Sequence, residues 1–95
     1  MKKLTIFYLE GCPYCAAARR ALKELSEEPV SVTAEIEWID ERAEAALADR
    51  YDYYYVPAVF DGERKLYEAR PGESYEVIRE NLRAALAAAQ GEDGR

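Results

Sequence analysis

The residues most able to carry chemistry are two cysteines, Cys12 and Cys15, which are separated by Pro13 and Tyr14. An apolar run over residues 4–9 precedes them, and an alanine-rich segment follows. The run has the β-branched and aromatic side chains of a buried strand, and the segment consists of strong helix formers without an internal glycine or proline. Both cysteines therefore fall at a predicted strand-to-helix junction, with Cys12 at or just before the first helical residue.

This position favours redox chemistry at Cys12. The first turn of a helix has amide groups without intrahelical partners, and the helix dipole adds partial positive charge there. Both stabilise a thiolate, which is the reactive form of cysteine. Pro13 suits the first helical position, where its missing N–H costs nothing. We interpret Cys12 as the attacking sulfur and Cys15, one turn later and deeper, as the sulfur that resolves a mixed disulfide.

Two other interpretations of the cysteine pair stay open at this point. Free cysteines are often buried and inert. A close pair can also bind metal, but structural zinc needs about four ligands. The chain has two cysteines and no histidine, so a metal would need a second protomer or carboxylates as further ligands. We expect no metal site and no tightly bound cofactor.

Composition limits the class of protein. The 95 residues suffice for one domain, which we expect over residues 1–90, with residues 91–95 as a disordered tail. The net charge of −6 argues against nucleic acid or an anionic membrane as the main partner. No stretch is apolar and long enough to span a bilayer or to act as a secretory signal. We expect a cytoplasmic monomer, and in the cytoplasm a close cysteine pair is more often catalytic or metal-binding than a structural disulfide.

The rest of the chain predicts a strand, a short helix, a hairpin and a final helix. Asp40 is a suitable N-cap for the short helix, and Ser74 for the final one. In order, the elements are a strand within residues 30–40 that begins nearer residue 33 or 34, a helix over 41–50, a hairpin over 59–69 that turns at Asp61-Gly62, and a helix over 75–89. Together with the first two elements, the order is β-α-β-α-β-β-α.

That order, with Cys-Pro-Tyr-Cys after the first strand and Val56-Pro57 at the start of the third, resembles the thioredoxin-like fold. The tetrapeptide itself is similar to the dithiol glutaredoxin motif, and the resemblance covers residues 3–89. It implies an α/β fold with a four-stranded mixed sheet flanked by helices. It also implies that Pro57 is cis and lies beside the cysteines, where the backbone of Val56 pairs with an extended substrate.

The resemblance implies a thiol–disulfide oxidoreductase that reduces protein or glutathione mixed disulfides. Glutathione or a reductase would then supply the electrons, with glutathione as a co-substrate. Cys12 and Cys15 are the expected catalytic residues, and the expected substrate contacts are Pro13, Tyr14, Val56, Pro57 and Arg70. Arg70 and the N–H groups near the start of the last helix could bind a carboxylate.

The chain also departs from the glutaredoxin pattern. Leu9 stands where that family usually has a lysine, and Glu68 and Ala69 lie in the region of its Gly-Gly pair. We expect Glu10, Glu68 and Glu73 to repel a glutathione carboxylate, which leaves protein disulfides open as substrates. Two other functions also stay open: a partner-binding module that uses the groove and a tyrosine cluster at residues 53–55, and a dimeric glutathione-ligated iron–sulfur carrier. Arg19 and Arg20 could assist the thiolate electrostatically, but they lie one to two turns into the helix, where screening is strong, and we interpret them as a solvated face.

Overall fold

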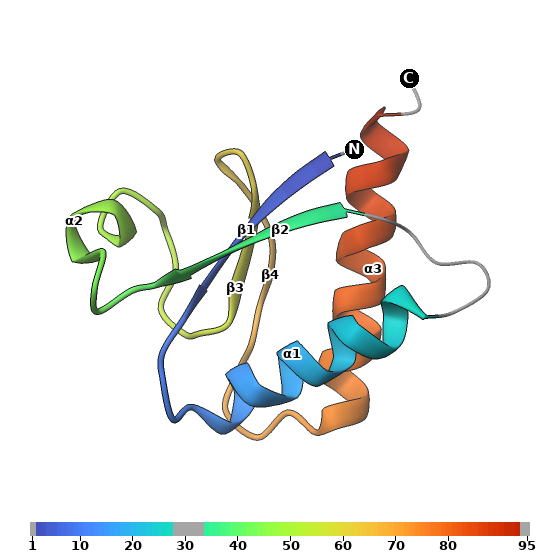
Figure 1. Ribbon diagram of the computed structural model, residues 1–95, viewed down its shortest axis with the longest axis horizontal. Coiled ribbons are helices and arrows are strands. Elements are labelled where there is room, and N and C mark those ends of the chain that lie inside the picture. The colour runs from blue at the N-terminus through green and yellow to red at the C-terminus, as the bar shows by residue number, and fades with distance from the viewer. Residues whose placement is uncertain (1, 28–33, 94–95) are drawn as a thin grey trace.

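The computed structural model describes residues 2–27 and 34–93. Its elements, in chain order, are β1 (Lys2–Tyr8), α1 (Pro13–Ser26), β2 (Ala34–Asp40), α2 (Ala45–Ala48), β3 (Ala58–Asp61), β4 (Arg64–Glu68) and α3 (Tyr75–Asp93). The predicted order β-α-β-α-β-β-α is confirmed (Figure 1). Residues 30–33, the first part of the second predicted strand, lie outside the described residues.

The strands form one mixed sheet in the order β2-β1-β3-β4. β1 pairs in parallel with β2 and antiparallel with β3, and β3 pairs antiparallel with β4. The register between β3 and β4 shifts between Val59 and Phe60, so a bulge interrupts this outer pairing. The outer strands also carry exposed charged side chains, among them Glu37 on β2 and Lys65 on β4.

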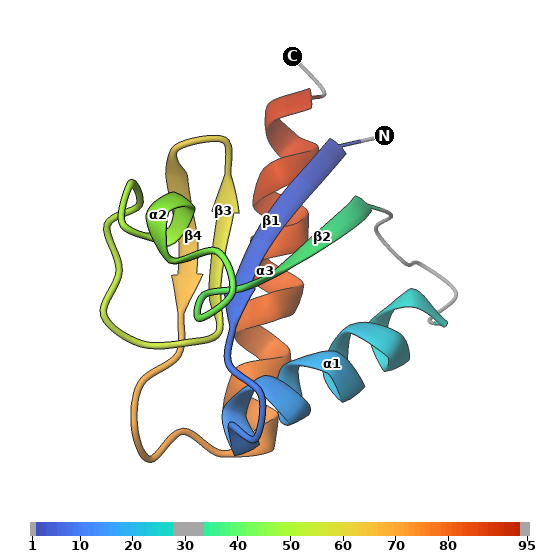
Figure 2. The same ribbon diagram turned by 60° about the vertical axis from the view of Figure 1, so that its left-hand side comes forward.

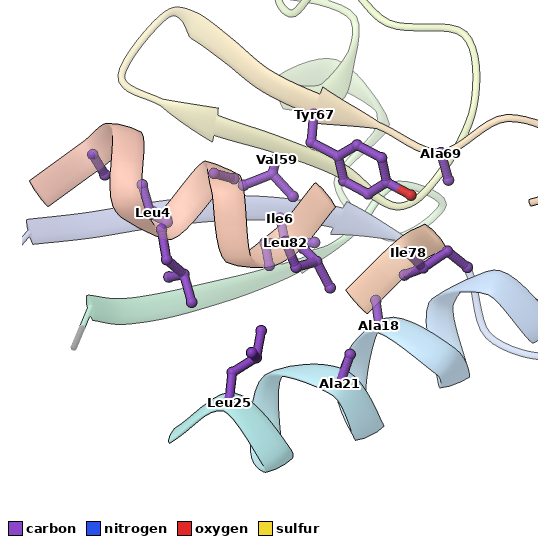
Figure 3. Close-up of a cluster of buried hydrophobic side chains, with 13 residues drawn as sticks. Leu4, Ile6, Ala18, Ala21, Leu25, Val59, Tyr67, Ala69, Ile78 and Leu82 are labelled. Atoms are coloured by element: carbon purple, nitrogen blue, oxygen red, sulfur yellow. The ribbon is translucent and has the colours of Figure 1, made fainter. Parts of the chain in front are cut away.

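Alternation along β1 gives the sheet two buried faces. Leu4 and Ile6 point to the face covered by α1 and α3, where they join the larger apolar cluster of the molecule (Figure 3). Phe7 points to the opposite face, where it packs with Phe60 and Ala48 beside α2. Figures 1 and 2 show the resulting layers, with α2 on one side of the sheet and the two longer helices on the other. β1 lies between these two cores and ends directly before the cysteines.

Small side chains let α1 lie close to the sheet and to α3. Ala18 and Ala21 are fully buried in the same cluster as Leu82 of α3. At the helix surface the Tyr75 hydroxyl donates a hydrogen bond to the Glu24 carboxylate, which ties the start of α3 to α1. Within the described residues no helix is both long and apolar enough to cross a bilayer.

Two helix boundaries differ from the prediction. The helix expected over residues 41–50 is only the single turn α2, because Glu44 has φ −118° and ψ 51°, outside the helical region. The prediction of Asp40 as N-cap is wrong for this helix, whose N-cap is Glu44. The Asp40 carboxylate instead accepts the N–H of Arg42 at 2.8 Å in the turns that precede the helix. α3 continues to Asp93, four residues past the predicted end at residue 89. The boundary expected at residue 90 therefore falls inside this helix.

We predict that Leu82→Ala lowers the free energy of unfolding by about 2–5 kcal/mol, because it leaves a cavity among fully buried side chains. Val77→Ala on the same helix is the matched control, since Val77 is 43% exposed and its truncation should change stability by less than about 0.5 kcal/mol. Urea denaturation followed by circular dichroism measures both. Equal effects of the two substitutions would contradict the packing described for α3.

Candidate active site

The two cysteines lie at the junction of β1 and α1, as predicted. Gly11 turns the chain out of the strand with a φ of +82°, a conformation that favours glycine. Cys12 then adopts extended angles at the N-cap position, and Pro13 begins the helix. The Cys12 carbonyl accepts the N–H of Ala16 at 3.1 Å. Cys12 therefore stands beside the amide groups of the first turn, which have no intrahelical partners.

The two thiols differ in exposure. Both cysteines are free, Cys12 is half-buried, and Cys15 is only 3% exposed. The pKa of the Cys15 thiol is raised to about 12, chiefly by burial and in smaller part by the neighbouring Cys12, while a backbone hydrogen bond at Leu9 and the charge of Arg19 act in the opposite direction. Cys15 therefore keeps its proton at neutral pH in the reduced protein.

An open cavity of about 370 Å³ lies beside both thiols. It is lined by residues 8–13, which lead out of β1 into α1, and by Cys15, Ala16 and Arg19 of the helix. Arg19 is exposed, as predicted, and it also lines this cavity, whereas Arg20 does not. The predicted contact Pro13 shares the cavity with the two cysteines.

The loop before β3 forms a second side of the site. The Val56-Pro57 peptide bond is cis, as the resemblance implies. Pro57 is buried, and its carbonyl accepts the N–H of Ala69 at 3.0 Å, which joins this loop to the end of β4. The Cys12 thiol lies 3.9 Å from the Val56 carbonyl oxygen, to which it donates. The fold thus brings together Cys12 and a carbonyl that lies 44 positions later in the sequence.

A carboxylate at the end of β4 holds this loop in place. Glu68 Oε2 accepts the backbone N–H groups of Tyr54 at 2.5 Å and Tyr55 at 2.6 Å, and Oε1 accepts Lys65 Nζ at 2.8 Å. Burial alone would raise the pKa of Glu68, but these three hydrogen bonds outweigh it and keep the pKa below its usual range. We call this set of contacts the Glu68 clasp. It fixes the two residues that immediately precede Val56.

Tyr14 and Arg70, two of the predicted substrate contacts, do not line the cavity beside the cysteines. The Tyr14 hydroxyl accepts the N–H of Gly72 at 2.7 Å and so connects α1 with the loop before α3. The Tyr67 hydroxyl donates to the Glu73 carboxylate at 2.6 Å in the same region. Arg70 lines a separate hollow over β4 and α3 that contains neither cysteine. Among the predicted contacts, the structure therefore places Pro13 in the lining of the dithiol cavity, the Val56 carbonyl at Cys12 with Pro57 next in sequence, and Arg70 away from the cavity.

The three consecutive tyrosines divide between the core and the surface. Tyr53 stacks on Phe7 with ring centroids 5.2 Å apart, and its hydroxyl donates to the Glu41 carboxylate at 2.5 Å. Tyr54 and Tyr55 point outward and are 85% and 50% exposed. Tyr53 thus closes the edge of the core, whereas the other two tyrosines stand exposed beside Val56.

The cysteine pair offers thiol chemistry. In residues 2–27 and 34–93, no group of three or more cysteine, aspartate or glutamate side chains is arranged to hold a metal ion. The cysteines are one helical turn apart at the edge of an open cavity, and one thiol is far more accessible than the other. Such a pair can cycle between a dithiol and a disulfide.

We predict that Glu68→Ala loosens the loop before Val56 and lowers stability by about 1–2 kcal/mol, because three donors lose their acceptor. Faster hydrogen exchange at the amides of Tyr54 and Tyr55 would be the direct sign. In the parent protein the stabilisation by Glu68 is fully present above the ordinary glutamate pKa. It is lost as the pH falls through the pKa of the folded state, which is lower than the ordinary one. Glu63→Ala, at an exposed position in the adjacent turn, is the control. Unchanged exchange in the Glu68 variant would refute the clasp.

We predict that iodoacetamide modifies Cys12 and leaves Cys15 almost untouched at pH 7. A thiol with a pKa of about 12 is ionised in about one molecule in 10⁵ at that pH, and Cys15 is also shielded by burial. Mass spectrometry of the digested protein locates the label. Cys15→Ser should keep the parent rate of labelling, and Cys12→Ser should lose it. Comparable labelling of both cysteines would contradict the buried position of Cys15.

Comparison with solved structures places the fold among thioredoxin-like proteins. A mutant thioredoxin from Halobacterium salinarum NRC-1 is 23% identical with a TM-score of 0.56, and the match covers 88% of this chain and 73% of that one. A protein described as malarial is 12% identical with a TM-score of 0.57, covering 84% and 91% of the two chains. Trxlp from Edwardsiella tarda EIB202 is 18% identical with a TM-score of 0.54, covering 84% and 80%. These identities support the shared fold alone.

Comparison at the level of sequence families adds the narrower relationship. No functionally curated protein matches the chain significantly. The family model for glutaredoxins, however, matches residues 4–65, well over half of the chain. The match runs from β1 through the cysteine pair and the cis-proline into β4, and so includes the elements that build the dithiol site. The chain belongs to the glutaredoxin family.

Proposed function

We propose that this protein is a thiol–disulfide oxidoreductase that reduces protein or glutathione mixed disulfides through Cys12 and Cys15. The observation that carries the proposal is the unequal exposure of two thiols at one helix N-terminus, with Cys12 Sγ 3.9 Å from the Val56 carbonyl oxygen. An attacking sulfur must be accessible to its substrate, whereas a resolving sulfur needs to reach only the first sulfur. The half-buried Cys12 and the buried Cys15 suit these two roles.

The reaction would take two steps. The Cys12 thiolate attacks one sulfur of the substrate disulfide, and the other substrate sulfur leaves with the electron pair of the broken bond and takes a proton from water. Cys15 loses its proton to water and attacks Cys12, which forms the internal disulfide and releases the second substrate sulfur as a thiol. The substrate gains two electrons and two protons. An external thiol reductant then returns the protein to the dithiol state.

The Val56 carbonyl supplies a means of holding the substrate. In the reduced protein this oxygen accepts the Cys12 thiol, and ionisation of Cys12 removes that donor. The carbonyl can then accept a backbone N–H of an extended segment that carries the disulfide. The Glu68 clasp keeps this carbonyl in place. Pro13, Val56 and Pro57 are accordingly our proposed substrate contacts.

Contacts in the loop before α3 favour protein disulfides over glutathione mixed disulfides. The resemblance implies a carboxylate near the N–H groups of this loop. Here the Gly72 N–H is bonded to Tyr14, and the Glu73 N–H is bonded to the Arg70 carbonyl at 3.2 Å. The Glu73 carboxylate adds negative charge in the same place. A glutathione carboxylate would have to displace these contacts, so we assign glutathione the role of co-substrate and electron donor.

Exposed aromatic side chains favour a second candidate, a partner-binding module. Tyr54 and Tyr55 are largely exposed directly before Val56, and exposed tyrosines are typical of protein-binding surfaces. In this alternative the fold recruits a protein through these side chains and the dithiol is incidental. The two functions separate in Cys12→Ser, which would abolish disulfide reduction and leave binding intact.

The cellular setting is proposed from the same chemistry. A dithiol reductase works where thiols are kept reduced, which favours the cytoplasm as its location. We propose that it acts as a monomer without a resident cofactor, and that glutathione or a reductase renews the dithiol.

We predict that the parent protein reduces a model protein disulfide when a thiol-based reductant is supplied, and that Cys12→Ser is inactive. Cys15→Ser should stop at the mixed disulfide with a protein substrate, because the resolving sulfur is absent. A glutathionylated peptide with glutathione as reductant is the parallel assay. There Cys15→Ser should keep activity, since glutathione itself can attack the mixed disulfide on Cys12.

Each outcome of these assays has a definite meaning. Activity on the glutathionylated peptide but not on the protein disulfide would show that glutathione mixed disulfides are the substrate, and would contradict our preference for protein disulfides. An inactive parent protein in both assays, with glutathione and with a thioredoxin-reductase-type donor, would refute the enzyme and favour the binding module.

A further inference from the structure

Arg19 has an unusual place beside the dithiol. It follows Cys15 by four positions, which puts the two residues one turn apart on the same side of α1. It also lines the cavity that both cysteines line, although no motif in the sequence marks it. The other charged residue of this cavity is Glu10, which is exposed and carries the opposite charge.

Two aromatic rings hold the guanidinium group of Arg19. Its Cζ lies 4.1 Å from the centroid of the Trp38 ring and 4.8 Å from that of Tyr8. The two rings meet edge to face with centroids 6.0 Å apart, at the ends of the parallel strands β1 and β2. Such cation–π contacts fix the position of the charge without neutralising it.

The charge of Arg19 is not paired with a carboxylate in the part of the chain that the structure describes. The next residue provides the contrast. Arg20 Nε lies 3.4 Å from the Glu24 carboxylate, and its Cζ lies 4.5 Å over the Tyr75 ring, on the side of α1 that faces α3. Two consecutive arginines therefore serve different purposes, and only Arg19 keeps an uncompensated charge beside the sulfurs.

The second step of the proposed reaction creates a need for such a charge. Cys15 must become a thiolate in a buried position before it can attack Cys12. The chain contains no histidine to take its proton. Burial and Cys12 disfavour the Cys15 thiolate, whereas a backbone hydrogen bond at Leu9 and, more weakly, the charge of Arg19 favour it. Arg19 is the cationic side chain among the groups that line the cavity.

We propose that Arg19 is a positioning residue for the resolving step, which acts through Cys15 by favouring its thiolate from a site fixed between Trp38 and Tyr8. The inference rests on the proposed function, because it concerns the second half of that reaction. In this step the Cys15–Cys12 bond forms, the bond from Cys12 to the substrate sulfur breaks, and the electron pair leaves with the substrate sulfur. The proton of Cys15 goes to water, and the negative charge passes from Cys15 to the leaving substrate sulfur.

The two steps can be separated with 4,4′-dithiodipyridine, an uncharged disulfide whose product thiopyridone absorbs light. Attack by Cys12 releases one thiopyridone, and attack by Cys15 on the mixed disulfide releases the second. Stopped-flow absorbance therefore follows both steps in one experiment, and Cys15→Ser shows the first release alone. A neutral reagent excludes a simple attraction between Arg19 and the substrate.

We expect Arg19→Met to slow the second release about 3- to 10-fold at pH 7 and to change the first by less than about 2-fold, as expected for loss of one exposed charge. The pH profile of the second release should move upward by about 0.5–1 unit, which is the same factor expressed as a pKa change. Arg19→Lys should restore much of the rate because it keeps the charge. Arg20→Met, the matched control on the neighbouring position, should leave both releases unchanged.

Several results would overturn the proposal. The first is an Arg19→Met variant that folds normally, as shown by circular dichroism, and keeps the second release and its pH profile as in the parent protein. Equal slowing by Arg20→Met, or equal slowing of both releases, would assign Arg19 a structural role. A parent protein that lacks the second release altogether would instead refute the proposed dithiol function, so the two failures are distinguishable.

Discussion

The buried face of α1 determines the chemistry of the site. Because an α-helix repeats every 3.6 residues, Cys15 falls on the same face as Ala18, Ala21 and Leu25, which pack into the core. The small alanines let the helix approach the sheet closely, and Cys15 is buried by the same packing. Cys12 precedes the first turn and stays partly exposed. The difference between the two sulfurs is thus first a matter of helix periodicity, which nearby charges then adjust.

The other side of the site depends on contacts between distant parts of the chain. The Val56 carbonyl reaches Cys12 because β3 lies next to β1 in the sheet. The loop before it has little apolar packing at Tyr54 and Tyr55 and is held by Glu68 instead. Removing a carboxylate from water costs free energy, and here its hydrogen bonds to two amides and Lys65 offset that cost. A charged side chain therefore does the positioning that hydrophobic packing does elsewhere in the molecule.

Local patterns sufficed to predict most of the fold. The apolar run before Cys12, the alanine-rich helix and the Asp-Gly turn are short-range signals, and the structure confirms the elements they indicate. Of the site, the cysteine pair was predicted from a local signal, and the cis Val56-Pro57 peptide was predicted from the family resemblance. The contacts of Glu68 lie 13 and 14 positions away, and those of Arg19 depend on the pairing of β1 with β2, so no spacing in the sequence marks them. The length of the one-turn α2 was overestimated because Glu44 has backbone angles outside the helical region, and no residue type in this segment predicts that interruption.

The outer strands of the sheet affect whether two copies of this protein can associate edge to edge. An unpaired strand edge offers backbone groups to a strand of another molecule. β2 presents Glu35 and Glu37 as exposed side chains, so two such edges brought together would place carboxylates near one another. β4, at the opposite edge, has exposed Lys65 and an interrupted register with β3. Charge at one edge and a bulge at the other discourage the sheet from extending into a second copy.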